Sequence, residues 1–195
     1  MSWQPITLES EFATLQPLTA EHCQALSDAV QDGKLWELWY TSVPTPERMH
    51  EEIERRLQLQ SRGSMLPFVV CDPQLTPVGM TTFMNIDSVN LRAEIGSTWY
   101  ARRVQRTPLN TACKKLLLTH AFETLGCIAV EFRTSFFNYP SRRAIERLGA
   151  KLDGILRQHQ RHANGTLRDT CVYSIVASEW PSVKAHLTYK LEQRY

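Results

Sequence analysis

The segment from residue 92 to residue 149 constrains the fold most, because strands and helices alternate in it with little chain between them. We predict, in order, a strand, a polar loop with three arginines, a helix, a strand and a helix, at residues 92–100, 101–107, 108–125, 128–134 and 138–148. The first amides of a helix lack partners and favour anions. A strand that leads through a basic loop into a helix therefore indicates a place to hold a phosphate.

The rest of the chain is expected to complete one α/β domain over residues 1–195, since we find no repeat and no low-complexity linker. Thr19, with His22 in the capping-box position, and Thr45 before Pro46 both predict helix starts. Asn164-Gly165 is a hairpin signal. Further strands are predicted at 12–17, 66–71, 78–85, 151–161 and 170–176, and further helices from 19, from 45 to 61 and from 178. This order predicts an α/β (α+β) domain with a mixed sheet.

Composition narrows the classes of function. The five cysteines form no CxxC pair, so we expect neither a disulfide framework nor a metal site, and the cytoplasm is the natural compartment. The start of the chain lacks the pattern of a signal peptide, and no apolar run reaches membrane-spanning length. The formal net charge of +2 argues against a nucleic-acid partner, although Arg102, Arg103 and Arg106 cluster.

The loop before the helix at 108–125 is the candidate phosphate site. Thr107 is the expected N-cap and Pro108 the first helical residue. The alternative is an ordinary helix start with solvated arginines. The residues that we assign to binding the phosphorylated ligand here are Gln105, Arg106, Thr107, Pro108, Leu109, Asn110 and Thr111.

The chain resembles the GNAT N-acetyltransferases, and within them the RimJ/RimL-like branch. The resemblance extends from about Phe12 to Leu187 and depends on the order and spacing of several short motifs. These are Glu94-Ile95-Gly96-x-Thr98-Trp99, the loop 105–111, Ala121-Phe122-Glu123-x-Leu125-Gly126, Asn138-x-x-Ser141, Leu148-Gly149-Ala150, Gly154-Ile155-Leu156-Arg157, Arg168-Asp169-Thr170-x-x-Tyr173-Ser174 and Glu179-Trp180-Pro181.

The resemblance implies a GNAT-like single domain whose mixed, mostly antiparallel sheet splays at its centre, between the strands at 94–99 and 128–134. It also implies acetyl-CoA as cofactor and a primary amine as acceptor, either a protein N-terminal α-amino group or a small molecule such as a polyamine, amino acid or aminoglycoside. A non-catalytic acyl-CoA-binding module is a further alternative. Pro108 and Asn110 depart from the family's loop pattern, which has small residues at both positions.

Three residues are candidates for the chemistry that the resemblance implies. Glu94 is the expected general base, or else only a charge at the mouth of a strand. Ser141 is the expected acid for the leaving sulfur. Asn138 lies beside the pantetheine, caps a helix, or does both. Ile145 occupies the place of the tyrosine acid of many members, so that mechanism is not supported. The resemblance also implies that a backbone amide near Ser97 or Thr98 polarises the carbonyl.

Aromatic residues are candidates for the wall of the acceptor site. Trp36, Trp39 and Tyr40 follow the first predicted helix, and Tyr173 is on a late strand, with His159 and His162 nearby. The alternative for each of them is a packing or solvated side chain, because large aromatics are usually buried. The final helix and the late strands are also the expected contact of a homodimer.

Overall fold

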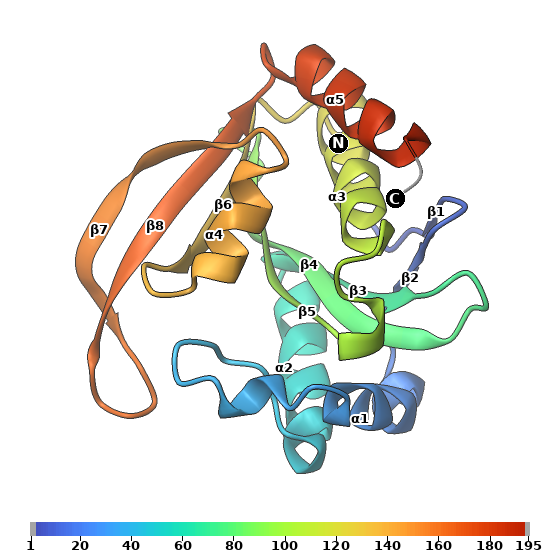
Figure 1. The fold of residues 1–195 in the computed structure, drawn as a ribbon, viewed down its shortest axis with the longest axis vertical. Coiled ribbons are helices and arrows are strands. Elements are labelled where there is room, and N and C mark those ends of the chain that lie inside the picture. Colours follow the sequence, from blue (N-terminus) through green and yellow to red (C-terminus); the bar gives the residue numbers. More distant parts are fainter. Residues whose placement is uncertain (1–2, 194–195) are drawn as a thin grey trace.

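The computed structural model describes residues 3–193, which form one mixed sheet of eight strands between two layers of helices (Figure 1). The spatial order of the strands is β1-β2-β3-β4-β5-β6-β8-β7. Their bounds are β1 Leu8–Glu9, β2 Thr14–Pro17, β3 Met65–Cys71, β4 Pro77–Asp87, β5 Arg92–Tyr100, β6 Ala129–Ser135, β7 Lys151–Arg161 and β8 Leu167–Val176. The predicted mixed sheet is therefore confirmed, and the short β1 is an addition to it.

The helices begin where the sequence places their signals. Thr19 and His22 form the predicted capping box, and Thr45 precedes the turn that leads into the second helix. The α-helices are α1 Cys23–Gln31, α2 Met49–Ser61, α3 Leu109–Thr119, α4 Tyr139–Glu146 and α5 Trp180–Glu192, with 3-10 turns η1 Ala20–His22, η2 Leu35–Glu37, η3 Pro46–Arg48 and η4 Arg102–Val104.

One predicted helix is shorter than expected. The α-helical part of 108–125 ends at Thr119 and continues as a π-turn over His120–Thr124, in which the Leu125 amide donates to the His120 carbonyl at 3.0 Å. Such a turn adds a residue to the helix without ending it. No propensity in the sequence marks this change.

Each face of the sheet has its own apolar core. α1 and α2 pack on one face around Met80 and Trp99, whereas α3, α4 and α5 cover the other face around Phe83 and Ile95. Alternating strand residues supply both cores, as the two-residue period of a strand requires. The sheet therefore has two differently covered sides, here called the α1/α2 face and the α3/α4 face.

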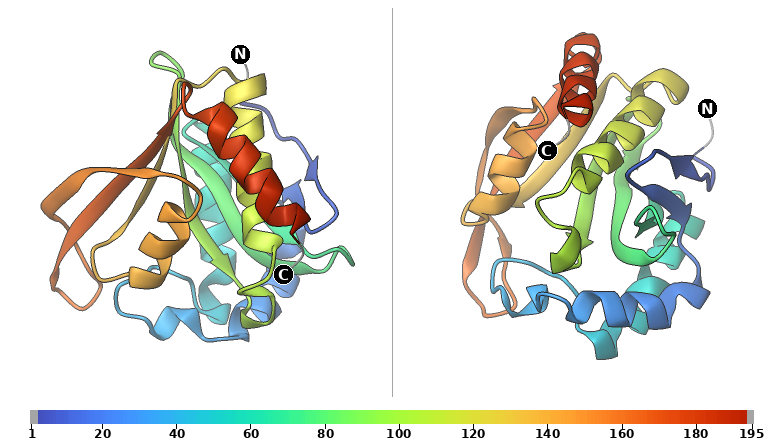
Figure 2. Two further views of the ribbon diagram at one scale, coloured as in Figure 1. Left: turned by 45° about the horizontal axis from the view of Figure 1, so that its top comes forward. Right: turned by 45° about the vertical axis from the view of Figure 1, so that its right-hand side comes forward.

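The sheet divides at its centre. β5 and β6 are the one parallel pair in the described sheet, and they pair only at Arg92–Ala129, Ala93–Val130 and Glu94–Glu131. Beyond Glu94 the two strands diverge, so that β6, β8 and β7 lean away from β3, β4 and β5 (Figures 1 and 2). The splay implied by the resemblance is confirmed, and its apex is at Glu94.

Two findings concern the chain's surroundings. No helix within residues 3–193 combines the length and apolar character needed to cross a bilayer. All five cysteines are free thiols, and Cys113 and Cys127 are buried in the core as the sequence predicts.

Candidate active site

Glu94 lies at the apex of the splay, on the α1/α2 face. Glu94 is only 6% exposed. Asn85 on β4 donates a hydrogen bond of 2.7 Å to Glu94 Oε2, and Arg133 Nε on β6 is 3.7 Å from the same oxygen. Burial raises the pKa of the Glu94 carboxyl, and Asn85 and Arg133 oppose this shift without cancelling it. The carboxyl is thus poised to take up a proton more readily than an ordinary glutamate.

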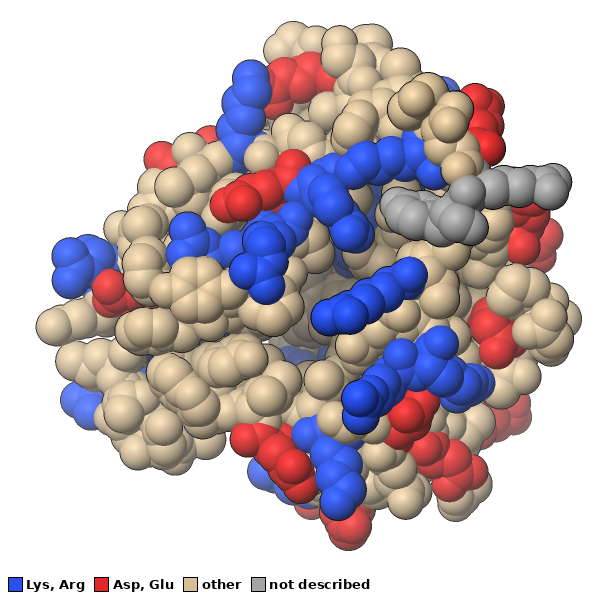
Figure 3. Space-filling model, in the orientation of Figure 1, with Lys and Arg blue, Asp and Glu red and all other residues tan. Residues whose placement is uncertain are grey.

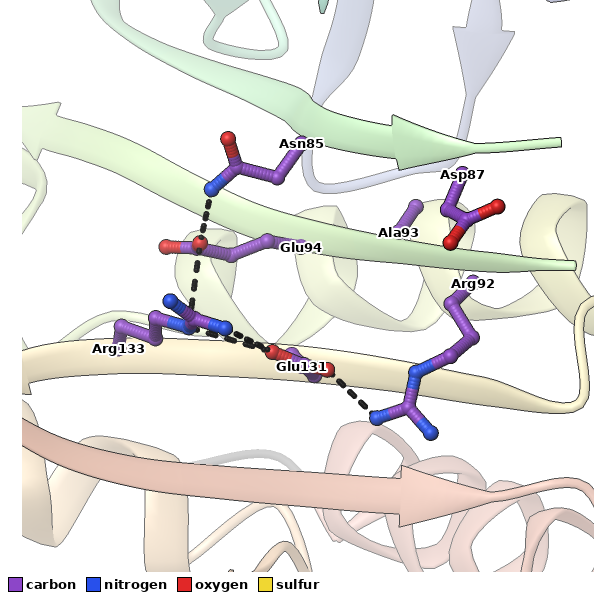
Figure 4. A pocket seen from close by; sticks show the side chains of 7 residues that line it. All are labelled: Asn85, Asp87, Arg92, Ala93, Glu94, Glu131 and Arg133. Atoms are coloured by element: carbon purple, nitrogen blue, oxygen red, sulfur yellow. Dashed lines mark hydrogen bonds and ion pairs between the residues drawn. The ribbon is translucent and has the colours of Figure 1, made fainter. Parts of the chain in front are cut away.

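A cavity of about 190 Å³ opens beside this carboxyl (Figure 4). A second carboxylate, Glu131, lines it and is held between Arg92 and Arg133. Burial tends to raise the pKa of Glu131, but hydrogen bonds from the two arginines outweigh it and lower this pKa. The pKa values of two neighbouring carboxylates are therefore shifted in opposite directions, that of Glu94 upward and that of Glu131 downward. Such a pair is a common arrangement for proton transfer.

Gly96 provides the room for the Glu94 carboxylate. A Cβ at this position would lie 2.9 Å from Glu94 Oε1 and 2.8 Å from the sulfur of Met84. Both distances are shorter than ordinary Cβ contacts, so a side chain here would force the Glu94 carboxylate and the Met84 sulfur to move. A glycine two residues after the glutamate is therefore part of the site.

A β-bulge lies in β5 directly after Gly96. Thr82 pairs with Gly96 and Met80 with Trp99, so β5 contains one more residue than β4 over this stretch, and Ser97 and Thr98 share the place opposite Thr81. Ser97 has a φ of +46°, an uncommon value for a residue with a side chain. Bulges of this kind interrupt the ladder and redirect backbone groups.

Two buried cations hold the bulge, one from each face. Arg56 of α2 donates from Nη2 to the Ser97 carbonyl at 3.0 Å, while Lys114 of α3 donates from Nζ to Thr98 Oγ1 at 2.8 Å. Lys114 also donates to Thr81 Oγ1 at 3.1 Å. Burial lowers the pKa of Lys114 to about 8. The strained backbone is thus anchored on both sides, as such strain requires.

The start of α3 forms the loop predicted to hold a phosphate. The helix begins at Leu109, one residue later than expected, because Pro108 is the N-cap and accepts from the Ala112 amide. Thr107 still contributes, since its Oγ1 accepts from the Leu109 amide at 3.3 Å. The Asn110 and Thr111 amides have no hydrogen-bond partner among the described residues. Two N–H groups therefore remain to bind an anion.

The side chains of this loop divide into two groups. Gln105 folds back to donate to the Tyr100 carbonyl at 2.9 Å, and the side chains of Leu109 and Thr111 are buried. Arg106, with a φ of +62°, and Thr107 are exposed. Leu109 and Thr111 can therefore contribute to ligand binding only through their backbone.

A hollow lies in the middle of the α3/α4 side and is rimmed by basic side chains (Figure 3). The exposed arginines in the segments that flank it are Arg102, Arg103 and Arg106 before α3, and Arg143 and Arg147 at α4. This rim suits a ligand that carries several phosphates.

The start of α4 lies across the splay from α3. Asn138 Oδ1 accepts from the Ser141 amide at 3.2 Å, which confirms that Asn138 caps the helix. Ser141 is partly exposed, and Ile145 is buried on the inner side of α4. The capping role orients Asn138 by its acceptor oxygen and leaves the side-chain amide of Asn138 for other partners.

The aromatic candidates that follow α1 lie in two different places. Trp39 is 46% exposed and packs edge-on against His162 of the β7–β8 hairpin, with ring centroids 5.0 Å apart, and also contacts Phe137. Tyr40 contacts Trp39, whereas Trp36 packs on the α1/α2 core. The segment between α1 and α2 thus arches across the open end of the splay.

Tyr173 departs from its expected position. It belongs to the core of the α3/α4 face, is 1% exposed, and donates to Glu146 Oε1 at 2.7 Å while accepting from Arg142. Because Glu94 lies on the opposite face, this geometry gives Tyr173 a role in fixing α4 instead of a place in the acceptor wall.

Sequence reasoning missed four buried or half-buried cations that shape the site. Arg56 and Lys114 lie among apolar helical positions, and a charged residue there does not predict burial. Arg133 and Arg168 alternate with core residues on β6 and β8, which is the one sequence signal that they share a face. No cluster of three or more His, Cys, Asp or Glu side chains suited to a metal is found in residues 3–193.

A divided sheet that has a buried carboxylate at its apex and a helix start with open amides at its rim has the features that the resemblance to acetyltransferases implies. The sequence profile of the family described as "Acetyltransferase (GNAT) domain" matches residues 13–151. The chain therefore belongs to the GNAT family of acetyltransferases.

Known relatives agree with this assignment. The chain is 35% identical over 106 residues to the Bacillus subtilis (strain 168) protein named "Putative ribosomal N-acetyltransferase YdaF". The aligned stretch covers 54% of this chain and 57% of that relative's length. The structure of a GCN5-related N-acetyltransferase from Brucella melitensis is 29% identical, with a TM-score of 0.84 over 95% of this chain and 85% of that one. Mycobacterium smegmatis RimJ in complex with CoA-disulfide, at 22% identity, shares the fold with a TM-score of 0.81 over 96% of both chains.

The buried Lys114 generates a prediction about stability. Its pKa of about 8 in the folded protein is below its ordinary value of 10.5, so the unfolded chain binds more protons between these values and stability should rise with pH. The unfolding free energy of the wild type relative to Lys114→Met should increase by roughly 1 kcal/mol from pH 7 to pH 9 in urea titrations. The neighbouring, partly exposed Lys115→Met is the matched control, and a flat difference for Lys114→Met would contradict the assignment.

Proposed function

We propose that this chain is an acetyl-CoA-dependent N-acetyltransferase that acts on a primary amine, and that its acceptor is the α-amino group of a protein N-terminus. The observation that carries the proposal is the splay of β5 from β6. It places a buried carboxylate with a raised pKa at its apex and a helix start with open amides at its rim. Membership of the GNAT family supports the same reaction class.

The residues around the α3 start fit a phosphorylated donor. The open amides of Asn110 and Thr111 are suited to a pyrophosphate, and Arg106 supplies charge beside them. Pro108 has no N–H, so its backbone can donate no hydrogen bond to the ligand. Gln105 and Thr107 hold the loop through their bonds to Tyr100 and Val104. Across the splay, the side-chain amide of Asn138 and the hydroxyl of Ser141 would contact the pantetheine arm.

Bound acetyl-CoA supplies an activated acetyl group as a thioester. In our proposal Glu94 takes a proton from the amine, directly or through a water, as the new N–C bond forms. The amides of the bulge at Ser97 and Thr98 stabilise charge on the carbonyl oxygen. As the C–S bond breaks, Ser141 donates a proton to the sulfur and regains one from solvent. The splay holds the two reactants in one place, which lowers the entropic cost of the transfer.

The acceptor enters from the α1/α2 face in this proposal. Trp39 and Tyr40 form an arch there, with Trp36 fixing its base on the core. The arch lies over the same side of the sheet as the Glu94 cavity, so an extended chain end beneath it would present its amine to the carboxylate. A relative named as a ribosomal N-acetyltransferase is consistent with a protein acceptor.

We place the enzyme in the cytoplasm, since five free thiols suit a reducing compartment. We also retain the proposal of a homodimer through the late strands. The edge strand β7 and its neighbour β8 expose apolar side chains that a second copy would cover, namely Leu152, Ile155, Leu156 and Leu167.

Adding a negative charge to the α3 start tests the donor site. Thr107→Glu should weaken acetyl-CoA binding at least tenfold in calorimetric titrations, because the new carboxylate would repel the pyrophosphate next to two open amides. Ser88→Glu, in the exposed β4–β5 turn at the other end of β5, is the control and should bind like the wild type. Equal binding by both variants would remove the loop from the donor site.

Removing the apex carboxylate tests the chemistry. Glu94→Gln should lower kcat by about 10²–10⁴-fold and leave acetyl-CoA affinity unchanged, since the base acts only in the transfer step. The wild-type rate should fall as the pH drops through the pKa of Glu94, which burial raises above its ordinary value of 4.5. This acidic limb should be absent in the variant. Glu54→Gln on the exposed side of α2 is the control, and wild-type turnover by Glu94→Gln would exclude Glu94 as the base.

A further inference from the structure

Three buried polar atoms near the acceptor side have no hydrogen-bond partner among the described residues. They are Ser135 Oγ at the end of β6, His162 Nε2 at the tip of the β7–β8 hairpin, and Arg168 Nε on β8. Buried donors and acceptors are costly to leave unpaired, so a group of them around one opening indicates a missing ligand.

Strand geometry places Ser135 and Arg168 on the face that holds Glu94. On β8, Cys171 and Tyr173 belong to the α3/α4 core, so Arg168 and Thr170 point to the other side. Ser135 pairs with Thr170 in the β6–β8 ladder. Ser135 and Arg168 therefore lie on the α1/α2 face of β6 and β8, the same face as Glu94.

Arg168 is the charged member of the group. It forms no ion pair with any carboxylate in residues 3–193, and its nearest acidic influence is Glu94, which raises the pKa of the guanidinium against the lowering effect of burial. Glu94 itself is occupied by Asn85 and Arg133. A half-buried guanidinium without a carboxylate partner is well suited to bind one bidentately.

The arch between α1 and α2 contacts the hairpin that carries this guanidinium. Trp39 contacts His162. Burial lowers the pKa of the His162 ring, and the positive charge of Arg168 lowers it further. His162 is thus close to Arg168 in space as well as to the arch. Trp39, His162, Arg168 and Glu94 therefore follow one another along the acceptor side, from the outer rim to the apex.

We infer that the acceptor carries a carboxylate a few bonds from its amine, with the carboxylate bound by Arg168 and assisted by Ser135 and His162 while the amine meets Glu94. This inference depends on the proposed transferase reaction and adds its acceptor class. It favours an N-terminus followed by Asp or Glu, or an amino acid with an acidic side chain. Polyamines and aminoglycosides are disfavoured, because Arg133 and Arg168 would repel a cationic body.

Matched acceptors test the inference. The wild type should acetylate a peptide with Glu at its second residue with a kcat/KM at least tenfold above that of the same peptide with Gln. Arg168→Gln should reduce this ratio to near one while its rate with the Gln peptide stays within about threefold, and Arg168→Lys should restore part of the ratio. Arg157→Gln, whose side chain is 79% exposed beside Asp169, is the control and should keep the full preference. Equal use of both peptides by the wild type, or a preference that persists in Arg168→Gln, would overturn the inference.

A binding measurement separates this inference from the transferase proposal. Calorimetry with the CoA-saturated protein should show tighter binding of the Glu peptide in the wild type and no difference in Arg168→Gln. Selective binding without turnover would preserve the anion site and contradict acetyl transfer. Turnover without selectivity would do the reverse. The same comparison with free glutamate and glutamine identifies whether the acidic acceptor is a peptide or a small molecule.

Discussion

The bulge in β5 is the constraint on which the site depends. It interrupts the β4–β5 ladder at Ser97 and Thr98, just where β5 has already left β6. Two buried cations stabilise it from opposite faces, Arg56 through the Ser97 carbonyl and Lys114 through the Thr98 hydroxyl. Both cations act through hydrogen bonds. Removal of Arg56 would leave the Ser97 carbonyl without this partner, and removal of Lys114 would do the same to the Thr98 hydroxyl.

The splay gives the two faces of one sheet different tasks. On the α3/α4 side, the open amides at Asn110 and Thr111 and the arginines near them create a positive rim. On the α1/α2 side, Glu94 and Glu131 lie in one cavity with opposed pKa shifts. A reaction between a phosphorylated donor and an amine acceptor needs both environments within reach of one point, and the gap between the diverging strands provides that point.

Much of this architecture was predictable from the sequence because its signals are local. The Thr19 capping box, the start after Thr45 and the Asn164-Gly165 turn depend on neighbouring residues, and each occurs where predicted. The geometry of the site was harder to predict from the sequence. The resemblance implies Glu94 as the base, but the burial of Lys114 and the lack of a hydrogen-bond partner for Arg168 Nε within residues 3–193 follow from tertiary packing. Tyr173 was assigned to the acceptor wall because sequence motifs do not reveal which face of a strand is covered by α4.

Hydrogen exchange followed by mass spectrometry, with and without CoA, tests the central claim most directly. If the donor lies in the splay, the amides of residues 105–112 and of the bulge at 96–99 should gain protection, as should the start of α4 at 138–142. The exposed edge strand β7 should change little. Protection confined to any other part of the chain, or none at 105–112 under saturating CoA, would contradict the account.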